Sequence, residues 1–487
     1  MTSRLICVSN RIALPRKAMA PGGLAIGIRG ALRRSGGLWF GWSGELTDTE
    51  PGAAQLHASD GVAYACIELP REEFVRYYDG YSNEALWPLM HHMPSRLTFR
   101  PQDREAYESI NARFAIRLHP LLAPDDLIWV HDYHLIPLGR RLRTLGVRAP
   151  IGFFLHTPFP YIETLRVLPN YAELVHDLLC YDVVGFQTAG DLESFLSAVR
   201  HLLGAASIGQ DGFVRVGERN VCCAVYPIGV DVESIQATAS TAYCSEPVRR
   251  MIDSLHQRKL VIGVDRLDYS KGLVERFAAY EHFLETCPEH RGRITYLQIA
   301  PLSRKDVQSY ARIRQRLEQA AGRTNGRFAE TDWTPIRYLN RNVPHGTLMG
   351  LMRAAQVGLV TPLRDGMNLV AKEYAAAQDP EDPGVLILST LAGAARELTS
   401  ALLVNPYDPS ALGRALQVAL AMPQAERRDR HAEMLHALEK RSIDAWVDGF
   451  VSALHGTHEG RRRPRTKDSA GAMMPEQLSS RPPRRRS

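Results

Sequence analysis

Short apolar runs alternate with stretches of helical periodicity along most of the chain. The runs are rich in Val, Ile and Leu and are apolar throughout, which is typical of strands buried on both faces of a parallel sheet. They are Leu5–Ser9, Leu127–Val130, Ile151–Leu155, Val183–Phe186, Leu260–Val264, Thr295–Ile299, Val357–Val360, Val385–Leu388 and Leu402–Val404. The stretches of helical periodicity include Gly23–Arg34, Leu165–Leu179, Leu273–Thr286 and Lys372–Gln378. This alternation predicts an α/β fold.

The length of the chain indicates more than one sheet. The segment Gln236–Glu246 is polar and rich in small residues, and it separates two series of strands and helices. A chain of this length readily divides into separate domains, each with its own core. We therefore expect two α/β lobes with a boundary between residues 235 and 255.

The composition is ordinary for a globular protein, since 45% of the 487 residues are hydrophobic and 23% are charged. No apolar run reaches the length of a membrane span, and the run Leu5–Val8 is too short for the core of a signal peptide. The seven cysteines include no C-x-x-C pair, which indicates buried, reduced thiols. We expect a cytoplasmic protein without a membrane partner.

The formal charge of +6 is concentrated at the C-terminus. Residues 457–487 carry nine basic and three acidic side chains, and the 50 basic and 50 acidic side chains before them cancel. The body therefore has no basic field to attract nucleic acid, and we expect no nucleic-acid partner. The tail is rich in Arg, Pro and Ser without hydrophobic periodicity, which predicts a disordered, solvated extension. A nucleic-acid or membrane role for this tail is the alternative.

Polar residues follow several of the predicted strands, at the edge where open α/β sheets bind ligands. Asn10 and Arg11 follow the first strand, and the loop after them reaches Gly22-Gly23 at the start of a helix. Glycines let a backbone approach a ligand closely, and a helix N-terminus offers N–H groups to an anion. A simple turn is the alternative.

Histidine and aspartate follow two neighbouring strands. The strand Leu127–Val130 ends in His131-Asp132-Tyr133-His134, and the strand Ile151–Leu155 ends in His156. Consecutive residues at a strand exit point in different directions and do not match a compact zinc pattern such as H-E-x-x-H. We therefore expect Asp and His to bind sugar hydroxyls here and expect no metal.

Two cations flank the loop between the strand Leu260–Val264 and the next helix. Arg266 and Lys271 lie beside a helix N-terminus, and both the charges and the helix dipole favour a diphosphate. The loop is not a P-loop, because G-x-x-x-x-G-K-[ST] is absent. The alternative is that these cations pair with Asp265 and Asp268.

Two further strand ends carry candidate ligands. Ser303 and Asp306 resemble a capping box, which puts Arg304 in a first helical turn, where a cation needs a nearby anion. Asn368 is a plausible N-cap, and one turn later the Glu373 carboxylate could bridge two hydroxyls of a ribose. An ordinary surface glutamate is the alternative.

Sequence segments in order along the chain resemble the trehalose-6-phosphate synthase family, whose members are retaining glycosyltransferases of the GT-B fold. They are VSNR (8–11), GGLWFGWSG (36–44), YYDGYSNEALWP (77–88), WVHDYHL (129–135), GFFLHTPFP (152–160), GFQT (185–188), VYPIGVD (225–231), DRLDYSKG (265–272), IAPLSR (299–304) and VTPLRDGMNLVAKEY (360–374). The resemblance covers residues 4–455. It implies two Rossmann-like lobes with the active site in the cleft between them.

The resemblance also implies limits for each part of the chain. The N-terminal, acceptor-binding lobe would cover residues 1–240, and the C-terminal, nucleotide-sugar-binding lobe would cover residues 241–440. A helix over 441–456 would pack back on the body, and the basic tail would cover 457–487.

The implied activity is transfer of glucose from UDP-glucose to glucose 6-phosphate, which gives α,α-trehalose 6-phosphate and UDP. Neither a metal nor another cofactor is implied, and the chain contains no Asp-x-Asp of the kind that holds a metal–diphosphate in the other large glycosyltransferase fold. A homo-oligomer is expected. The alternatives are a related transferase with another phosphorylated acceptor, such as glycerol 3-phosphate, and a catalytically silent sensor of sugar phosphates.

The roles of individual residues are carried over from the resemblance. The implied acceptor ligands are Arg11, Tyr78 and Arg304 for the phosphate and Asp132 and Trp87 for the glucose. The implied donor ligands are Gly22, Gly23, Arg266, Lys271, Val343, Asp365, Leu369, Val370, Ala371, Lys372 and Glu373. The implied catalytic residues are Arg266, Lys271, His156 and Asp132. Relatives commonly carry a larger residue at the position of Val343, so the choice among UDP, GDP and ADP stays open.

Overall fold

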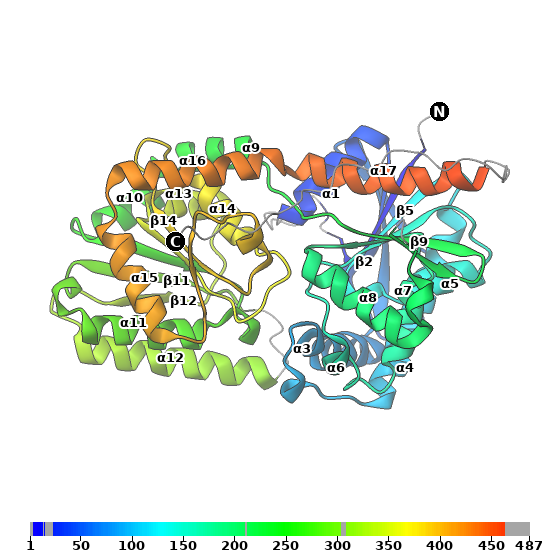
Figure 1. Ribbon diagram of the computed structural model, residues 1–487, viewed down its shortest axis with the longest axis horizontal. Helices are drawn as coiled ribbons and strands as arrows, with labels where there is room; N and C mark the ends of the chain where they lie inside the picture. Colours follow the sequence, from blue (N-terminus) through cyan, green and yellow to red (C-terminus); the bar gives the residue numbers. More distant parts are fainter. Residues whose placement is uncertain (1–2, 13, 15–22, 210–211, 303–307, 463–487) are drawn as a thin grey trace, which may run out of the picture.

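The computed structural model describes residues 3–12, 14, 23–209, 212–302 and 308–462. These residues fold around two sheets, one in each lobe (Figure 1). The first sheet has nine strands in the order β3-β4-β2-β1-β5-β6-β7-β9-β8, and the second has six in the order β12-β11-β10-β13-β14-β15. The α/β fold with two lobes is confirmed.

The strands of the first sheet are parallel except at its two edges, where β3 and β8 run antiparallel to their neighbours. They are β1 (Leu5–Arg11), β2 (Leu38–Thr47), β3 (Gln55–Ser59), β4 (Val62–Pro70), β5 (Leu127–His131), β6 (Ile151–Phe154), β7 (Val183–Phe186), β8 (Phe213–Val216) and β9 (Arg219–Val225).

The second sheet is parallel throughout. Its strands are β10 (Lys259–Val264), β11 (Ile294–Ile299), β12 (Ile336–Leu339), β13 (Val357–Val360), β14 (Val385–Ser389) and β15 (Leu402–Val404). All the apolar runs predicted as strands are strands of the two sheets. The strands that the pattern missed are the mixed or partly polar ones, β2, β3, β4, β8, β9 and β12.

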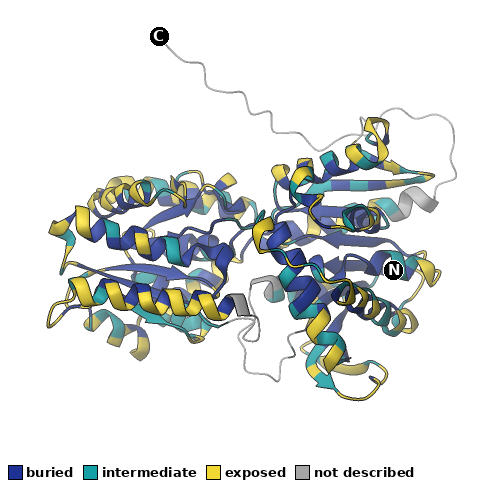
Figure 2. Ribbon diagram, turned by 90° about the horizontal axis from the view of Figure 1, so that it is seen from below, coloured by how far each residue is buried: buried dark blue, intermediate teal, exposed yellow. Residues whose placement is uncertain are grey.

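Helices cover the faces of both sheets, and the strands lie buried between them (Figure 2). The first lobe contains α1 (Gly23–Ser35), α2 (Arg71–Phe74), the π-helix η1 (Val75–Leu86), α3 (Trp87–Met90), α4 (Pro101–Leu118), α5 (Leu138–Thr144), α6 (Ile162–Leu165), α7 (Tyr171–Leu178) and α8 (Ala189–Leu203). The helices after them are α9 (Val232–Tyr243), α10 (Glu246–Asp253), α11 (Leu273–Thr286), α12 (Gln308–Phe328), α13 (His345–Ala354), α14 (Leu369–Ala377), α15 (Pro409–Ala421), α16 (Gln424–Lys440) and α17 (Ile443–Arg462).

One stretch that was predicted as a single helix is two helices in the structure. The stretch Leu165–Leu179 forms the end of α6 and then α7, with the helix interrupted over residues 166–170. Pro169 lies in the interruption, and a proline lacks the N–H that a helix interior needs and also keeps the preceding residue out of helical geometry. The helix Leu273–Thr286 has the predicted limits, and α14 begins at Leu369, before the predicted Lys372.

The chain reaches the second lobe before α9 begins at Val232. Most of the segment Gln236–Glu246 belongs to α9, which packs against α13 and α14 on the side of the second sheet. The lobe limits given above remain a prediction.

Helix α17 returns to the first lobe, where it packs against α1, β5 and β7 (Figure 1). Its Phe450 ring stacks on Trp129 at 4.6 Å between centroids. A Cβ atom at Gly152 or at Gly185 would lie 2.6 or 2.9 Å from the Phe450 ring. Two strands therefore carry glycine where this helix approaches them. Among the described helices, none is long and apolar enough to cross a membrane.

Candidate active site

The loop between β10 and α11, residues 265–272, is here called the diphosphate loop. Its first residue, Asp265, is buried and accepts a hydrogen bond from Arg276 Nη1 at 2.7 Å. Arg276 also donates from Nε to Thr361 Oγ1 at 2.9 Å and from Nη2 to the Lys271 carbonyl at 3.2 Å. Asp265 therefore fixes Arg276 and does not neutralise the two cations of the loop.

The two predicted cations have different surroundings. Lys271 is buried, and its Nζ lies 2.5 Å from Asp365 Oδ2. Arg266 is exposed, and its guanidinium lies 5.7 Å from the centre of the Trp87 ring without an ion pair to any described residue. The alternative in which both cations pair with Asp265 and Asp268 is therefore wrong.

Asp365 lies on the loop after β13, between Lys271 and the start of α14. Burial raises the pKa of this carboxyl, but the Lys271 ammonium outweighs burial, so the pKa lies below its ordinary value. Asn368 Nδ2 donates to the same carboxylate oxygen at 2.9 Å. Asp365 is therefore ionised at neutral pH and holds Lys271 in place.

Asn368 is the N-cap of α14, as predicted. Its side-chain oxygen accepts from Ala371 N–H at 3.1 Å, and its backbone φ is +78°. The N–H groups of Leu369 and Val370 in the first turn have no partner within the helix. They stand next to Asp365 and Lys271 in a position suited to an anion.

Glu373 and Lys372 follow in the same helix with opposite environments. Glu373 is partly exposed, and desolvation raises its pKa to about 7, which does not fit an ordinary surface glutamate. Lys372 is fully buried, and its Nζ donates to the Ile228 carbonyl at 2.7 Å and to Glu397 Oε2 at 2.9 Å. The Lys372 side chain therefore holds the segment that connects the lobes against the second lobe. Only the main chain of Lys372 is left to bind the nucleotide-sugar.

Val343, the residue predicted near the nucleotide base, belongs to the same hydrophobic cluster as the first residues of α14. Val343 precedes α13 and is partly buried, and it packs with Leu369 and Val370 against the same hydrophobic cluster. Ala371 is fully buried beside them. The donor side therefore combines an apolar wall with a helix N-terminus.

Asp132 follows β5 with a backbone φ of +74°, a conformation that is rare outside glycine. Its Oδ1 accepts from the His156 main-chain N–H at 3.2 Å, and its own N–H donates to the Phe154 carbonyl at 2.9 Å. The strained turn thus points the carboxylate along the end of the neighbouring strand β6.

His156 contacts a second histidine of the predicted group, His131, which is the last residue of β5. His156 Nε2 lies 3.2 Å from His131 Nδ1. Burial lowers the pKa of His156 to about 3 and that of His131 well below its ordinary value. Both rings are therefore neutral at physiological pH, and His131 fixes the orientation of His156.

A series of stacked aromatic rings connects Arg11 with Tyr78. The Arg11 guanidinium lies 5.4 Å from the centre of the Trp42 ring. Phe74 lies between Trp42 at 4.6 Å and Tyr78 at 5.1 Å, measured between ring centroids. Gly44 has a φ of +91°, and a Cβ there would lie 2.9 Å from Arg11 Nη2, so glycine makes room for the guanidinium.

The two lobes meet at the predicted site. A Cβ atom at Gly366 would lie 2.1 Å from the His156 carbonyl oxygen, so the loop that carries Asp365 abuts the end of β6. Trp87 Nε1 lies 3.3 Å from Asp268 Oδ1 of the diphosphate loop. The structure therefore brings Asp365 beside His156 and Trp87 beside the diphosphate loop.

Two predicted ligands, Gly22 and Arg304, lie outside the described residues, and Gly23 is the first residue of α1. Sequence reasoning missed Asp268 as a partner of Trp87, because nothing in the local pattern shows a contact between residues so far apart. In the part of the chain that the structure describes, no group of three His, Cys, Asp or Glu side chains could hold a metal ion.

Comparison with known proteins gives one consistent result. The model of glycosyltransferase family 20 matches residues 9–456. The trehalose-6-phosphate synthase of Klebsiella pneumoniae is 48% identical over 453 residues, which are 93% of this chain and 95% of that protein.

Solved structures agree with the sequence relatives. The crystal structure of a UDP-forming α,α-trehalose-phosphate synthase from Burkholderia vietnamiensis is similar with a TM-score of 0.90 and 50% identity, over 94% of this chain and 99% of that one. The corresponding enzyme of Burkholderia xenovorans in complex with glucose 6-phosphate has a TM-score of 0.90 and 47% identity, over 93% of this chain and 100% of that one.

Proposed function

Because the chain belongs to glycosyltransferase family 20, we infer that it transfers glucose from UDP-glucose to glucose 6-phosphate. It is a retaining, UDP-forming trehalose-6-phosphate synthase, and its products are α,α-trehalose 6-phosphate and UDP. The observation that supports this conclusion is the contact between the lobes, where the loop that carries Asp365 abuts His156 and the diphosphate loop contacts Trp87. One related enzyme of known structure is UDP-forming, and another was solved in complex with glucose 6-phosphate.

The donor side suits a nucleoside diphosphate. Arg266 and Lys271 supply positive charge to the diphosphate, and the first-turn N–H groups of α14 supply hydrogen-bond donors. The Glu373 carboxylate suits the two hydroxyls of the ribose, which would replace the water lost on burial. The base would lie against the apolar wall around Val343, and the UDP-forming relatives favour uracil over guanine or adenine.

The acceptor side suits a phosphorylated sugar. Arg11 and Tyr78 are assigned to the phosphate, together with Arg304. Asp132 and Trp87 are assigned to the glucose, because a carboxylate accepts from sugar hydroxyls while an indole face covers the ring. The stacking of Tyr78 between Phe74 and His134, with ring centroids at 5.1 and 5.7 Å, holds its hydroxyl in one position.

Arg266 and Lys271 act on the step in which UDP leaves. As the bond between the anomeric carbon and the phosphate oxygen breaks, the electron pair stays on UDP, and Arg266 and Lys271 stabilise this charge. The acceptor hydroxyl attacks the oxocarbenium-like carbon from the face that UDP leaves, which retains the configuration. Its proton passes to the departing phosphate. This route needs no protein nucleophile, because the attacking group is the acceptor hydroxyl.

The two alternatives are weaker. A glycerol 3-phosphate acceptor would leave Trp87 and Asp132 without a sugar ring to bind. A catalytically silent sensor would be expected to lose donor-binding residues, whereas Lys271, Glu373 and the start of α14 are all present here. A homo-oligomeric state, a cytoplasmic location and a solvated role for the tail remain predictions.

Release of UDP by the purified protein tests this function. UDP-glucose is supplied with and without glucose 6-phosphate, and the product is analysed for a non-reducing disaccharide phosphate. We expect release that depends on glucose 6-phosphate. Nucleotide release only with GDP-glucose, ADP-glucose or glycerol 3-phosphate would show that the proposed substrate is wrong. Absence of nucleotide release with every pair would favour the sensor of sugar phosphates.

A further inference from the structure

Asp268 is a buried carboxylate in the middle of the diphosphate loop, and the chemistry above does not use it. Only 1% of the Asp268 surface is exposed to solvent. Its Oδ1 accepts from Trp87 Nε1 at 3.3 Å and from the Ser270 main-chain N–H at 2.9 Å. Its Oδ2 accepts from the Tyr310 hydroxyl at 3.0 Å. Among the described residues, three donors therefore engage the two oxygens of this carboxylate.

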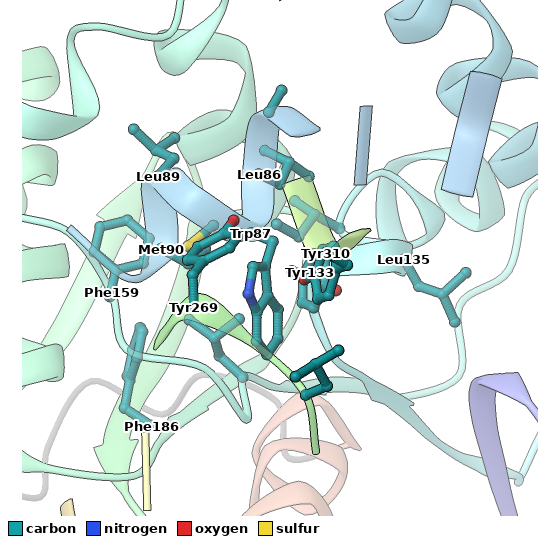
Figure 3. Close-up of a cluster of buried hydrophobic side chains, with 14 of the residues drawn as sticks. Leu86, Trp87, Leu89, Met90, Tyr133, Leu135, Phe159, Phe186, Tyr269 and Tyr310 are labelled. Carbon is teal, nitrogen blue, oxygen red and sulfur yellow. The ribbon is translucent and has the colours of Figure 1, made fainter. Parts of the chain in front are cut away.

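The three donors come from three separate parts of the molecule. Trp87 belongs to α3 of the first lobe, Ser270 to the diphosphate loop itself, and Tyr310 to α12 of the second lobe. Figure 3 shows Trp87 inside a buried cluster to which Tyr269 and Tyr310 contribute from the second lobe. Asp268 is thus the point at which the acceptor tryptophan, the loop and the second lobe are joined.

Other contacts cross the same boundary beside Asp268. The Arg266 guanidinium lies 5.7 Å from the centre of the Trp87 ring, and the Arg96 guanidinium lies 4.8 Å from the centre of the Tyr269 ring. These are cation–π contacts of modest strength. The hydrogen bond from Trp87 Nε1 to Asp268 Oδ1 crosses the same boundary directly.

We propose that Asp268 is a positioning residue that couples acceptor binding to donor binding, an inference that rests on the proposed function. The acceptor sugar orders Trp87, and the diphosphate orders the loop that carries Arg266 and Lys271. The bond between Trp87 and Asp268 needs both partners in place at once. Each ligand therefore stabilises a contact that the other also needs, and the coupling is reciprocal.

The coupling is measured as the change in UDP affinity on saturation with glucose 6-phosphate, by calorimetry on the full chain. For the wild type we expect UDP to bind about 5-fold or more tightly when the acceptor is present, the lower end of typical coupling between sites. Trp87→Phe keeps a ring but removes the indole N–H, and Asp268→Ala removes the acceptor of that bond. Both are expected to lower the coupling to about 2-fold or less.

A conservative variant and a matched control separate coupling from stability. Asp268→Asn keeps one oxygen for the indole and is expected to restore part of the coupling. Trp333→Phe removes another buried indole hydrogen bond, one that lies within the second lobe and runs from Trp333 Nε1 to the Ile294 carbonyl at 2.7 Å, at the start of β11. This control is expected to lower the melting temperature and to keep the coupling.

The outcomes are distinct. Coupling that stays at the wild-type value in folded Trp87→Phe overturns the inference even if Asp268→Ala fails to fold. A wild type that makes the disaccharide phosphate but shows no coupling also overturns the inference and leaves the proposed function intact. A wild type that releases no nucleotide with any sugar pair overturns the proposed function.

Discussion

The donor side and the acceptor side of the cleft are held in place by different kinds of contact. On the donor side, buried ion pairs fix the charged loops, namely Asp265–Arg276, Lys271–Asp365 and Lys372–Glu397. On the acceptor side, stacked rings fix the predicted ligands, and the two histidines beside them are neutral. A site that binds a diphosphate needs cations whose own counter-charges are already positioned, whereas a site that binds a sugar ring needs flat surfaces and oriented hydroxyl partners. Changes in charge should therefore affect the first side, and changes in shape the second.

The largest expected effect follows from removal of Arg276, the buried cation under the diphosphate loop. Arg276→Met leaves Asp265 buried without a partner, and breaking a pair of this kind costs about 3–5 kcal/mol of unfolding free energy. Denaturant unfolding measures the loss. Arg314→Ala is the matched control, because Arg314 pairs with Glu318 on the exposed face of α12 and is expected to change stability by less than about 1 kcal/mol. Equal losses in the two variants would remove the contrast between buried and exposed pairs.

Lys271→Ala is expected to lower turnover by about 10²-fold or more, the scale for losing a group that stabilises developing charge. Arg266→Ala is expected to have an effect of the same scale. Initial rates of UDP release at saturating substrates measure both.

Lys259→Ala provides the control for this charge. Lys259 lies at the other end of β10, where its Nζ donates to the Leu420 carbonyl at 2.7 Å. We expect wild-type turnover in this variant. Unchanged turnover in both Lys271→Ala and Arg266→Ala would contradict the role given to the diphosphate loop.

On the acceptor side, Phe74→Leu removes the ring between Trp42 and Tyr78 but no charge. Stacked aromatic pairs are worth about 0.5–1.5 kcal/mol, so the KM for glucose 6-phosphate should rise about 3- to 10-fold. The KM for UDP-glucose should stay near its wild-type value. Phe328→Leu is the control, since Phe328 lies at the end of α12 in the second lobe, where the Arg291 and Arg327 guanidiniums are 5.0 Å from the centre of its ring. A similar rise in both KM values for Phe74→Leu would contradict the separation of the two sides.

The smallest effect is a pH dependence of donor binding. Burial raises the pKa of Glu373 to about 7, so in the free protein its carboxylate is mostly protonated at pH 6 and mostly ionised at pH 8. The ionised form accepts from ribose hydroxyls, and UDP affinity is therefore expected to increase with pH by about 3- to 10-fold over this range. Because burial makes the pKa of Glu373 higher in the folded than in the unfolded chain, the contribution of this group to the free energy of unfolding is fully present below the ordinary pKa of a glutamate. That contribution is lost as pH rises through about 7.

Glu373→Gln supplies the control for this titration, because the UDP phosphate also titrates in that range. The variant is expected to bind UDP more weakly and to keep only the pH dependence that belongs to the phosphate. Parallel pH profiles for the wild type and the variant would show that Glu373 does not titrate in donor binding.

Much of this molecule could be predicted from local sequence patterns. Buried parallel strands leave continuous apolar runs, so the central strands of both sheets were identified, and the residues after them were recognised as candidates for ligand binding. Asn368 was recognised as an N-cap because capping depends on neighbouring residues alone. The mixed strands at the sheet edges were missed, since their exposed faces carry polar residues without a clear period.

The partners of the charged residues were decided only by the tertiary structure. Lys271 pairs with Asp365 rather than with Asp265 or Asp268, and the Lys372 side chain is buried against Glu397. Trp87 of the first lobe donates to Asp268 of the second. The sequence determines which segments become strands, helices and strand-end loops, because those properties depend on residues near one another in the chain. It does not show which strand-end loops face each other, because that depends on how the two sheets twist and pack, and this packing sets the charges and contacts of the site.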